Sequence, residues 1–196
     1  MCIRDSLRHR ADGEGAPEQL SGTLRQDYPA AVSPDGRLLI TRILPASSGD
    51  VVWLPVEGGE ARVVVGTPDY EGGADLSPDG KWLIYVSNSS GRMEVYLRPF
   101  DRTDRYPVST AGGLHPLWSR DGRRIFFRQG QQMLAVDVTT SPTVRLGAPT
   151  VLFERRYSWG LNLTIANYSL SKDGREFLMV REEGGQYLSL IFNWLQ

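Results

Sequence analysis

The chain has 196 residues, of which 40% are hydrophobic and 23% are charged, and its formal net charge is −1. These values fit a globular protein with a substantial core, and they give no basis for nucleic acid or an anionic membrane as a general partner. No apolar run approaches the roughly 20 residues of a membrane-spanning helix, so we expect no membrane segment in this chain. Cys2 is the only cysteine and cannot form an internal disulfide, so cysteine usage does not indicate the compartment.

The first six residues, MCIRDS, are unlike anything later in the chain. They back-translate to a sequence that resembles a transposon end used to prepare sequencing libraries, so we interpret residues 1–6 as adapter read as protein. The alternative is an ordinary disordered terminus, and on either interpretation we expect residues 1–14 to be disordered. On the adapter interpretation the chain is part of a longer gene, and the absence of a signal peptide or membrane anchor is uninformative.

From residue 15 onward the chain alternates short apolar runs with clusters of turn residues, which predicts strands rather than helices. A spare strand is expected at 16–21. Three groups of four strands follow, at 29–33, 37–43, 50–56 and 60–65; at 73–77, 81–87, 93–99 and 105–109; and at 114–119, 123–128, 131–138 and 150–154. A last group, at 165–171, 175–181 and 187–194, lacks a fourth strand.

One turn signal occurs in each group, between its first and second strands. Its aspartate can hydrogen-bond the local backbone, and its glycine supplies a positive φ without steric cost. The aspartates lie 44, 42 and 52 residues apart, a period typical of four-stranded propeller blades. The copies are Ser33-Pro34-Asp35-Gly36, Ser77-Pro78-Asp79-Gly80, Ser119-Arg120-Asp121-Gly122 and Ser171-Lys172-Asp173-Gly174.

The repeats also resemble a known family. The strings SPDGKWLIYVSNSSGRMEVYLRPF, STAGGLHPLWSRDGRRIFFR, VLFERRYS and SKDGREFLMV resemble the WD-repeat-like blades of the six-bladed TolB-type propeller. They are most similar to the C-terminal propeller of bacterial eukaryotic-like serine/threonine protein kinases. The closing residues of this chain, LSLIFNWLQ, resemble the usual end of those proteins. We therefore expect an all-β fold, a β-propeller of four-stranded antiparallel blades. Residues 15–196 would be an incomplete C-terminal part, about four blades of a six-bladed ring, arranged as an open arc.

The resemblance implies a non-catalytic binding or sensor module, which would be the C-terminal region of a larger receptor-like kinase. In such a parent protein a membrane segment would lie upstream of the propeller, and the propeller would lie outside the cytoplasm. The alternatives are the gating propeller of a prolyl-oligopeptidase-like serine hydrolase and a stand-alone periplasmic scaffold. In such hydrolases the catalytic domain follows the propeller, whereas this sequence stops on a blade strand, so we favour the first interpretation. The partner, a protein or a small-molecule ligand, is not identified by the sequence.

The chain contains no glycine-rich loop followed by a strand lysine, no HRD or DFG motif and no G-x-S-x-G elbow. We therefore expect no enzymatic activity in this chain, and no cofactor or metal. A propeller enzyme with a channel metal would need acids or histidines that converge on the inner strands. Asp75 is the only acid among those strands, so this third alternative is disfavoured.

Two places carry candidate binding residues. His115 precedes Pro116 at the start of an inner strand, where the axial channel of a propeller opens, and it could contact a ligand or be an ordinary polar loop residue. The longest crossing between blades is both basic and aromatic, as recognition loops often are. The alternative is that its aromatic side chains pack over the blade edge. The crossing's candidate residues are Arg155, Arg156, Tyr157 and Trp159.

The repeated aspartates could be calcium ligands, but the same residue type in four equivalent turns indicates a structural role within each turn. We therefore assign a structural role to Asp35, Gly36, Asp79, Gly80, Asp121, Gly122, Asp173 and Gly174.

Overall fold

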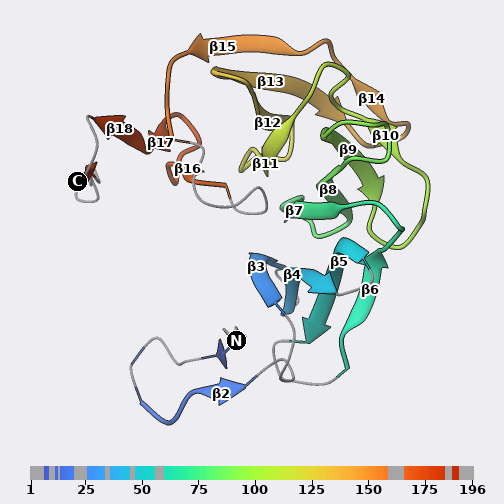
Figure 1. The fold of residues 1–196 in the computed structure, drawn as a ribbon. Helices are drawn as coiled ribbons and strands as arrows, with labels where there is room; N and C mark the ends of the chain where they lie inside the picture. Colours follow the sequence, from blue (N-terminus) through green and yellow to red (C-terminus); the bar gives the residue numbers. More distant parts are fainter. Residues whose placement is uncertain are drawn as a thin grey trace.

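The fold is described from a computed structural model, which places residues 7–8, 12, 14–19, 26–33, 36–44, 47–55, 60–158, 166–183 and 187–189. These residues form strands, turns and bends, and none of them is helical. Figure 1 shows the sheets arranged as an open arc, each with its first strand toward the centre. The expectation of an all-β, incomplete propeller is confirmed.

Three antiparallel sheets make up the middle of the arc, and in each the strand order follows the chain outward. The first contains β3 (Gln26–Val32), β4 (Arg37–Leu44), β5 (Ser47–Pro55) and β6 (Arg62–Val65). The second contains β7 (Glu71–Leu76), β8 (Trp82–Ser87), β9 (Glu94–Pro99) and β10 (Tyr106–Pro107). The third contains β11 (Leu114–Trp118), β12 (Arg124–Gln129), β13 (Gln132–Thr139), β14 (Arg145–Leu146) and β15 (Thr150–Glu154).

The outer edge of the third sheet differs from the predicted single strand at 150–154. Both β14 and β15 pair with β13, β14 near its C-terminal end and β15 near its N-terminal end. The two strand residues of β14 are too few to show an alternating pattern, so this strand is not predictable from the sequence.

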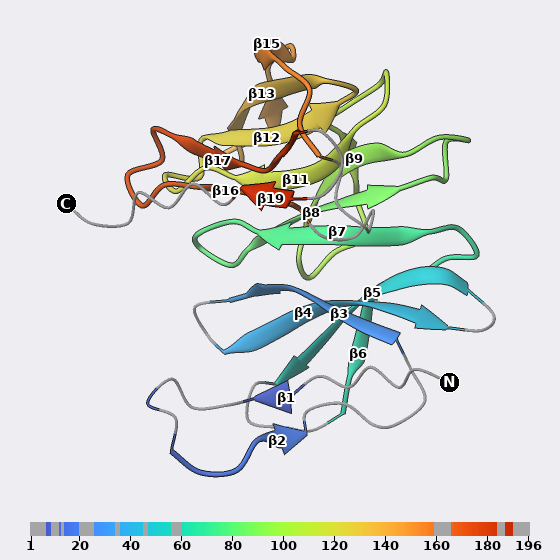
Figure 2. The ribbon, with the colours of Figure 1, turned by 60° about the vertical axis from the view of Figure 1, so that its left-hand side comes forward.

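Short strand pairs lie at the two ends of the arc. At the C-terminal end, β16 (Tyr168–Leu170) pairs with β17 (Phe177–Met179), and β18 (Arg181–Glu183) pairs with β19 (Tyr187–Ser189). At the N-terminal end, β1 (Leu7–Arg8) pairs with β2 (Glu18–Gln19). The predicted spare strand thus pairs with β1, and among the described residues no strand pair joins the two ends of the arc (Figures 1 and 2). β1 lies within the stretch predicted to be disordered, and residues 1–6 lie outside the described residues.

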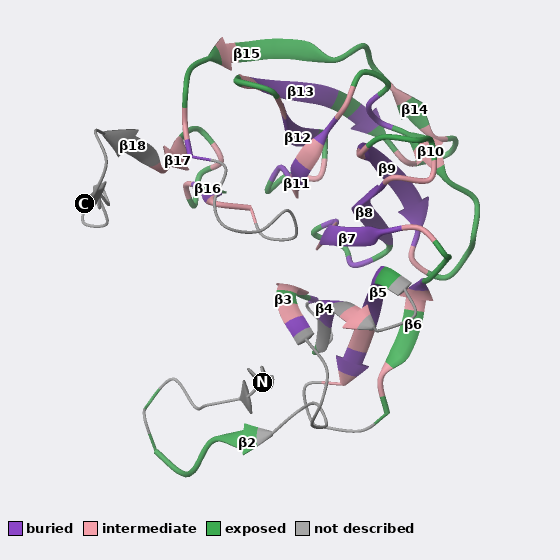
Figure 3. Ribbon diagram, in the orientation of Figure 1, coloured by how far each residue is buried: buried purple, intermediate pink, exposed green. Residues whose placement is uncertain are grey.

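The apolar core lies between neighbouring blades, and β8 shows how the sequence produces it. All six residues of β8 are buried, because alternate side chains point to opposite faces of the sheet and each face is covered (Figure 3). Ile84 on one face joins the cluster shared with the third blade, which includes Phe127. Tyr85 on the other face joins the cluster shared with the first blade, which includes Leu39. A third cluster joins the third blade to β16 and β17.

Candidate functional site

The Ser-x-Asp-Gly turns lie at equivalent corners, between the first and second strands of each blade. In the third blade, Gly122 N donates to Ser119 O (3.0 Å), and the Ser119 hydroxyl donates to the Asp121 carboxylate (2.6 Å). That hydroxyl also accepts from Arg124 N (2.8 Å). The turns that begin at Ser77 and Ser171 repeat this pattern. All four glycines have φ between 69° and 78°, as the turn requires, while Asp35 lies outside the described residues.

Neighbouring turns lie on one face of the array. A Cβ at Gly122 would lie 3.4 Å from Pro78 in the preceding turn, and one at Gly174 would lie 3.8 Å from Arg120. The pKa of Asp121 is lowered by the hydrogen bond from Ser119 and then by the backbone N–H of Arg123. Within the described part of the chain, no group of three or more His, Cys, Asp or Glu side chains could hold a metal ion. Asp79, Asp121 and Asp173 are each hydrogen-bonded within their own turn.

The crossing that follows β15 is tied to the third blade by Arg128. Its guanidinium, buried near the end of β12, donates to Ser158 O (2.6 Å) and to Tyr157 O (3.1 Å). The Tyr157 ring packs edge-on against Phe153 at 6.1 Å, which is the packing that the alternative interpretation predicts. Arg155 and Arg156 are exposed, and Trp159 lies outside the described residues.

The inner strands β3, β7, β11 and β16 enclose a cavity of about 290 Å³ on the axis of the arc. Figures 1 and 2 show these four strands as the innermost element of each blade. Three of them, β3, β7 and β11, carry a register shift where they line the cavity. Such bulges re-aim side chains and are over-represented next to functional sites. The polar side chains on the cavity wall belong to Asp75, His115, Arg120, Tyr168 and Ser169.

His115 lies on this wall, as the sequence predicted, but in an unusual backbone conformation. Its φ is 54°, the only positive value for a non-glycine residue in the described part of the chain. A residue held in this region costs on the order of 1–3 kcal/mol and persists where its surroundings over-determine it. The residue is 1% exposed, and its carbonyl accepts a hydrogen bond from the Tyr168 hydroxyl (2.6 Å). This bond joins the third blade to the fourth.

Asp75 lies on the same wall, on β7, and was not among the predicted site residues. Its Oδ1 accepts from Leu76 N (2.9 Å) and its Oδ2 accepts from Trp118 N (2.9 Å), so the carboxylate bridges the second and third blades. Burial raises the pKa of Asp75 to about 6, against the opposing effects of these two hydrogen bonds and of the Arg120 charge. The signal available in the sequence was that Asp75 is the only acid within the predicted inner strands; the observed strands β3 and β7 begin earlier and also include Asp27 and Glu71.

Arg120 lies at the rim of the cavity, in the third turn. It is exposed, and it also lines a larger open groove of about 750 Å³ between the turns that contain Asp121 and Asp173. Arg120 acts on Asp75 through its charge, and no ion pair joins these two described residues. Asp121 is engaged by Ser119 and Arg123 within the same turn.

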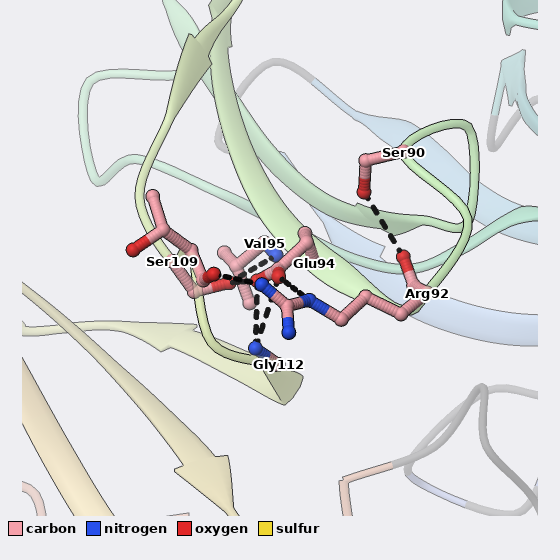
Figure 4. A network of polar contacts seen from close by, with 7 residues as sticks. Ser90, Arg92, Glu94, Val95, Ser109 and Gly112 are labelled. Atoms are coloured by element: carbon pink, nitrogen blue, oxygen red, sulfur yellow. Dashed lines mark hydrogen bonds and ion pairs between the residues drawn. The ribbon is translucent and has the colours of Figure 1, made fainter.

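Glu94, a buried carboxylate at the start of β9, accepts hydrogen bonds from several donors (Figure 4). It accepts from Arg92 Nε (2.6 Å), from the Ser109 hydroxyl and from Gly112 N (2.9 Å). Arg92 also donates to Thr110 O. This network fixes the crossing between the second and third blades onto β9, and it leaves the carboxylate little capacity for a ligand. Glu94 thus holds this crossing in place.

No helix in the described part of the chain is both long and apolar enough to cross a membrane. No family model matches the chain, and no curated protein matches it. Several solved structures do. The chain is similar to TolB from Acinetobacter baumannii, with a TM-score of 0.68 at 19% identity over 92% of this chain and 43% of that one.

It is also similar to a puromycin-hydrolyzing peptidase from Mycobacterium tuberculosis, with a TM-score of 0.67 at 17% identity over 93% of this chain and 33% of that one. A third similar structure is an oligogalacturonate lyase in complex with manganese, with a TM-score of 0.62 at 15% identity over 92% of this chain and 52% of that one. The chain thus spans about half the length of these proteins or less. At these identities the likeness shows the fold: the chain is an incomplete, TolB-like β-propeller.

Proposed function

We propose that this chain is the non-catalytic binding or sensor part of a larger protein, and that the axial cavity is its binding site. The observation that carries this proposal is the convergence of three bulged inner strands on one wall, where Asp75, the acid among the residues that line the cavity, and the strained residue His115 lie together. Concave sites with a few convergent polar groups and a perturbed pKa are the usual places for ligands.

The parent protein that we propose is a bacterial receptor-like serine/threonine kinase, with this propeller as its C-terminal, extracytoplasmic region. Support comes from the word order of the repeats, which resembles kinase-linked propellers, and from the TolB-like fold. On this proposal the phosphate-transfer chemistry belongs to another domain of the parent. The purified chain should then transfer no phosphate from ATP and should hydrolyse no ester or peptide.

A second candidate is the gating propeller of a serine hydrolase, which the likeness to the puromycin-hydrolyzing peptidase favours. The two candidates make different predictions for the flanking gene. A kinase parent requires HRD and DFG motifs upstream of the propeller, whereas a hydrolase parent requires a G-x-S-x-G motif downstream. Sequencing the gene on both sides decides between them.

The binding proposal is tested by closing the cavity. Ser169 has an exposed side chain and lines the cavity, so Ser169→Trp should fill the space without disturbing the core. Thr103→Trp, on an exposed loop outside the cavity, is the matched control. A library of soluble metabolites is screened against the 196-residue chain by saturation-transfer NMR. We expect compounds whose signal is lost with Ser169→Trp and kept with Thr103→Trp. A library without such compounds would contradict the proposal.

A further inference from the structure

The proposed function does not specify a class of ligand, but the charged side chains on the cavity wall favour one class over others. We infer that the axial cavity takes a small zwitterion, an α-amino acid or a close relative, with its ammonium group on Asp75 and its carboxylate on Arg120. This inference rests on the proposed function, because it assigns a ligand to the same site.

Asp75 is suited to a cation because its carboxylate is held in place by neutral donors. The two backbone N–H groups that bond it each occupy one oxygen and bring no net charge. An ionised carboxylate has about four acceptor positions, so capacity remains for a donor from the cavity. A carboxylate that burial makes harder to ionise gains most from a positive charge placed beside it.

Arg120 supplies the opposite charge at the mouth of the cavity. Its guanidinium is exposed and forms no ion pair with any described residue, and the nearest turn carboxylate, Asp121, is bonded within its own turn. The planar donor fork of arginine matches a carboxylate in a bidentate manner. A ligand with only one charge would leave either Asp75 or Arg120 uncompensated, whereas a zwitterion matches both.

The size and the remaining lining of the cavity agree with this ligand class. A volume of about 290 Å³ lies at the lower end of the range for small-molecule sites, so nucleotides and larger cofactors are disfavoured. Pro116, Leu117 and Leu170 give part of the wall an apolar surface for an aliphatic side chain. A divalent cation is disfavoured because Asp75 and His115 are too few ligands among the described residues.

The test uses the 196-residue chain and the common amino acids as probes, each at millimolar concentration, in saturation-transfer NMR. For each amino acid that binds and has an uncharged side chain, its amide carries only the positive charge and its N-acetyl form carries only the negative one. We expect the free amino acid to bind at least about tenfold more tightly than either derivative, because each loses one charge-assisted contact.

Two variants test which charged group of the ligand each residue binds. Asp75→Asn should weaken binding of the amino acid and its amide by about tenfold or more, and Arg120→Gln should do so for the amino acid and its N-acetyl form. Arg102→Gln removes an exposed arginine outside the cavity and should change nothing. If Asp75→Asn does not fold, as judged by its circular dichroism, Arg120→Gln carries the test alone because its side chain is exposed.

The inference is overturned if both variants bind amino acids as tightly as the original chain. It is also overturned if no amino acid binds while other metabolites are lost with Ser169→Trp; in that case the proposed function stands and the ligand class is wrong. If Ser169→Trp changes the binding of no compound at all, the proposed function and this inference both fail.

Discussion

The turn aspartates and Asp75 are the same side chain in two regions of the molecule, and their environments are opposite. Asp79, Asp121 and Asp173 each accept from a serine hydroxyl and a backbone N–H within their own turn. Asp75 instead accepts from two backbone N–H groups, one of which belongs to the neighbouring blade. The pKa of each turn aspartate is lowered, whereas that of Asp75 is raised to about 6.

The difference shows how the role of an acidic residue in a repeat protein can be inferred from whether it recurs. An acid that recurs at the same place in every repeat meets the same local need each time, here the closure of a tight turn. An acid that does not recur needs an explanation of its own: Glu94 holds a crossing between blades through its hydrogen bonds, whereas Asp75 lies on a cavity wall at a cost in desolvation, where we propose that it binds a ligand. The two environments therefore predict different responses to substitution and to pH.

The largest effect should be the pH dependence of stability due to Asp75. Its pKa in the folded chain, about 6, lies above its ordinary value of 3.8, so its contribution is fully present below pH 3.8 and is lost as the pH rises through 6. Relative to Asp75→Asn, the original chain should therefore lose on the order of 2 kcal/mol of unfolding free energy between pH 4 and pH 7. Urea denaturation at several pH values measures this, and a flat difference would contradict it.

The serine of a turn should contribute more to the free energy of unfolding than its aspartate does. Ser119→Ala removes the hydroxyl that accepts from Arg124 N and donates to Asp121, and it leaves a partly buried N–H group unsatisfied. We expect a loss of about 1–3 kcal/mol in the free energy of unfolding. Thr103→Ala, at an exposed loop position, should stay within about 0.5 kcal/mol of the original chain. Equal effects of the two substitutions would show that the turn hydroxyl is dispensable.

The turn glycine should contribute through its backbone conformation. Gly122→Ala places a Cβ at φ 69°, where an L-residue costs about 1–2 kcal/mol, and that Cβ meets only Pro78 at an ordinary 3.4 Å. Gly130→Ala is a matched control, since its φ is 56° and no heavy atom lies within 4 Å of the new Cβ. Thermal unfolding should give the same loss for both variants. A much larger loss at Gly122 would mean that crowding between neighbouring turns dominates.

The smallest effect should come from a turn carboxylate. In Asp121→Asn the amide oxygen can still accept from Ser119 and Arg123 N, so we expect a loss within about 0.5 kcal/mol at pH 7. The pKa of Asp121 is lowered in the folded chain, so its stabilisation is present above pH 3.8 and is lost as the pH falls through the folded value. The direction is opposite to that of Asp75, and denaturation near pH 3 should detect it.

Much of this fold could be predicted from the sequence because its signals are local. A tight turn followed by a strand that is apolar on both faces requires only neighbouring residues, and the strands from residue 26 to residue 139 lie within a few residues of their predicted ranges. The position of His115 on an inner strand followed from the same reasoning. The strands β1 and β14 were not predicted, and each has only two strand residues.

The candidate site was less predictable because it depends on how adjacent blades meet. The bond between Asp75 and Trp118 N joins residues 43 positions apart and requires two sheets to dock in one register. Arg128 likewise reaches Tyr157 O, 29 positions away. The positive φ of His115 is not specified by any residue type in the sequence.

Asp75 and the turn aspartates should have opposite electrostatic environments, and the pKa values of their carboxyl groups test this directly. Carbon-detected NMR of the side-chain carboxyls, followed from pH 2 to pH 8, gives the pKa of each aspartate separately. We expect a pKa near 6 for Asp75 and values below 3.8 for Asp79, Asp121 and Asp173. A pKa for Asp75 at or below 3.8 would contradict the account, because the inner-strand acid would then be one more structural carboxylate.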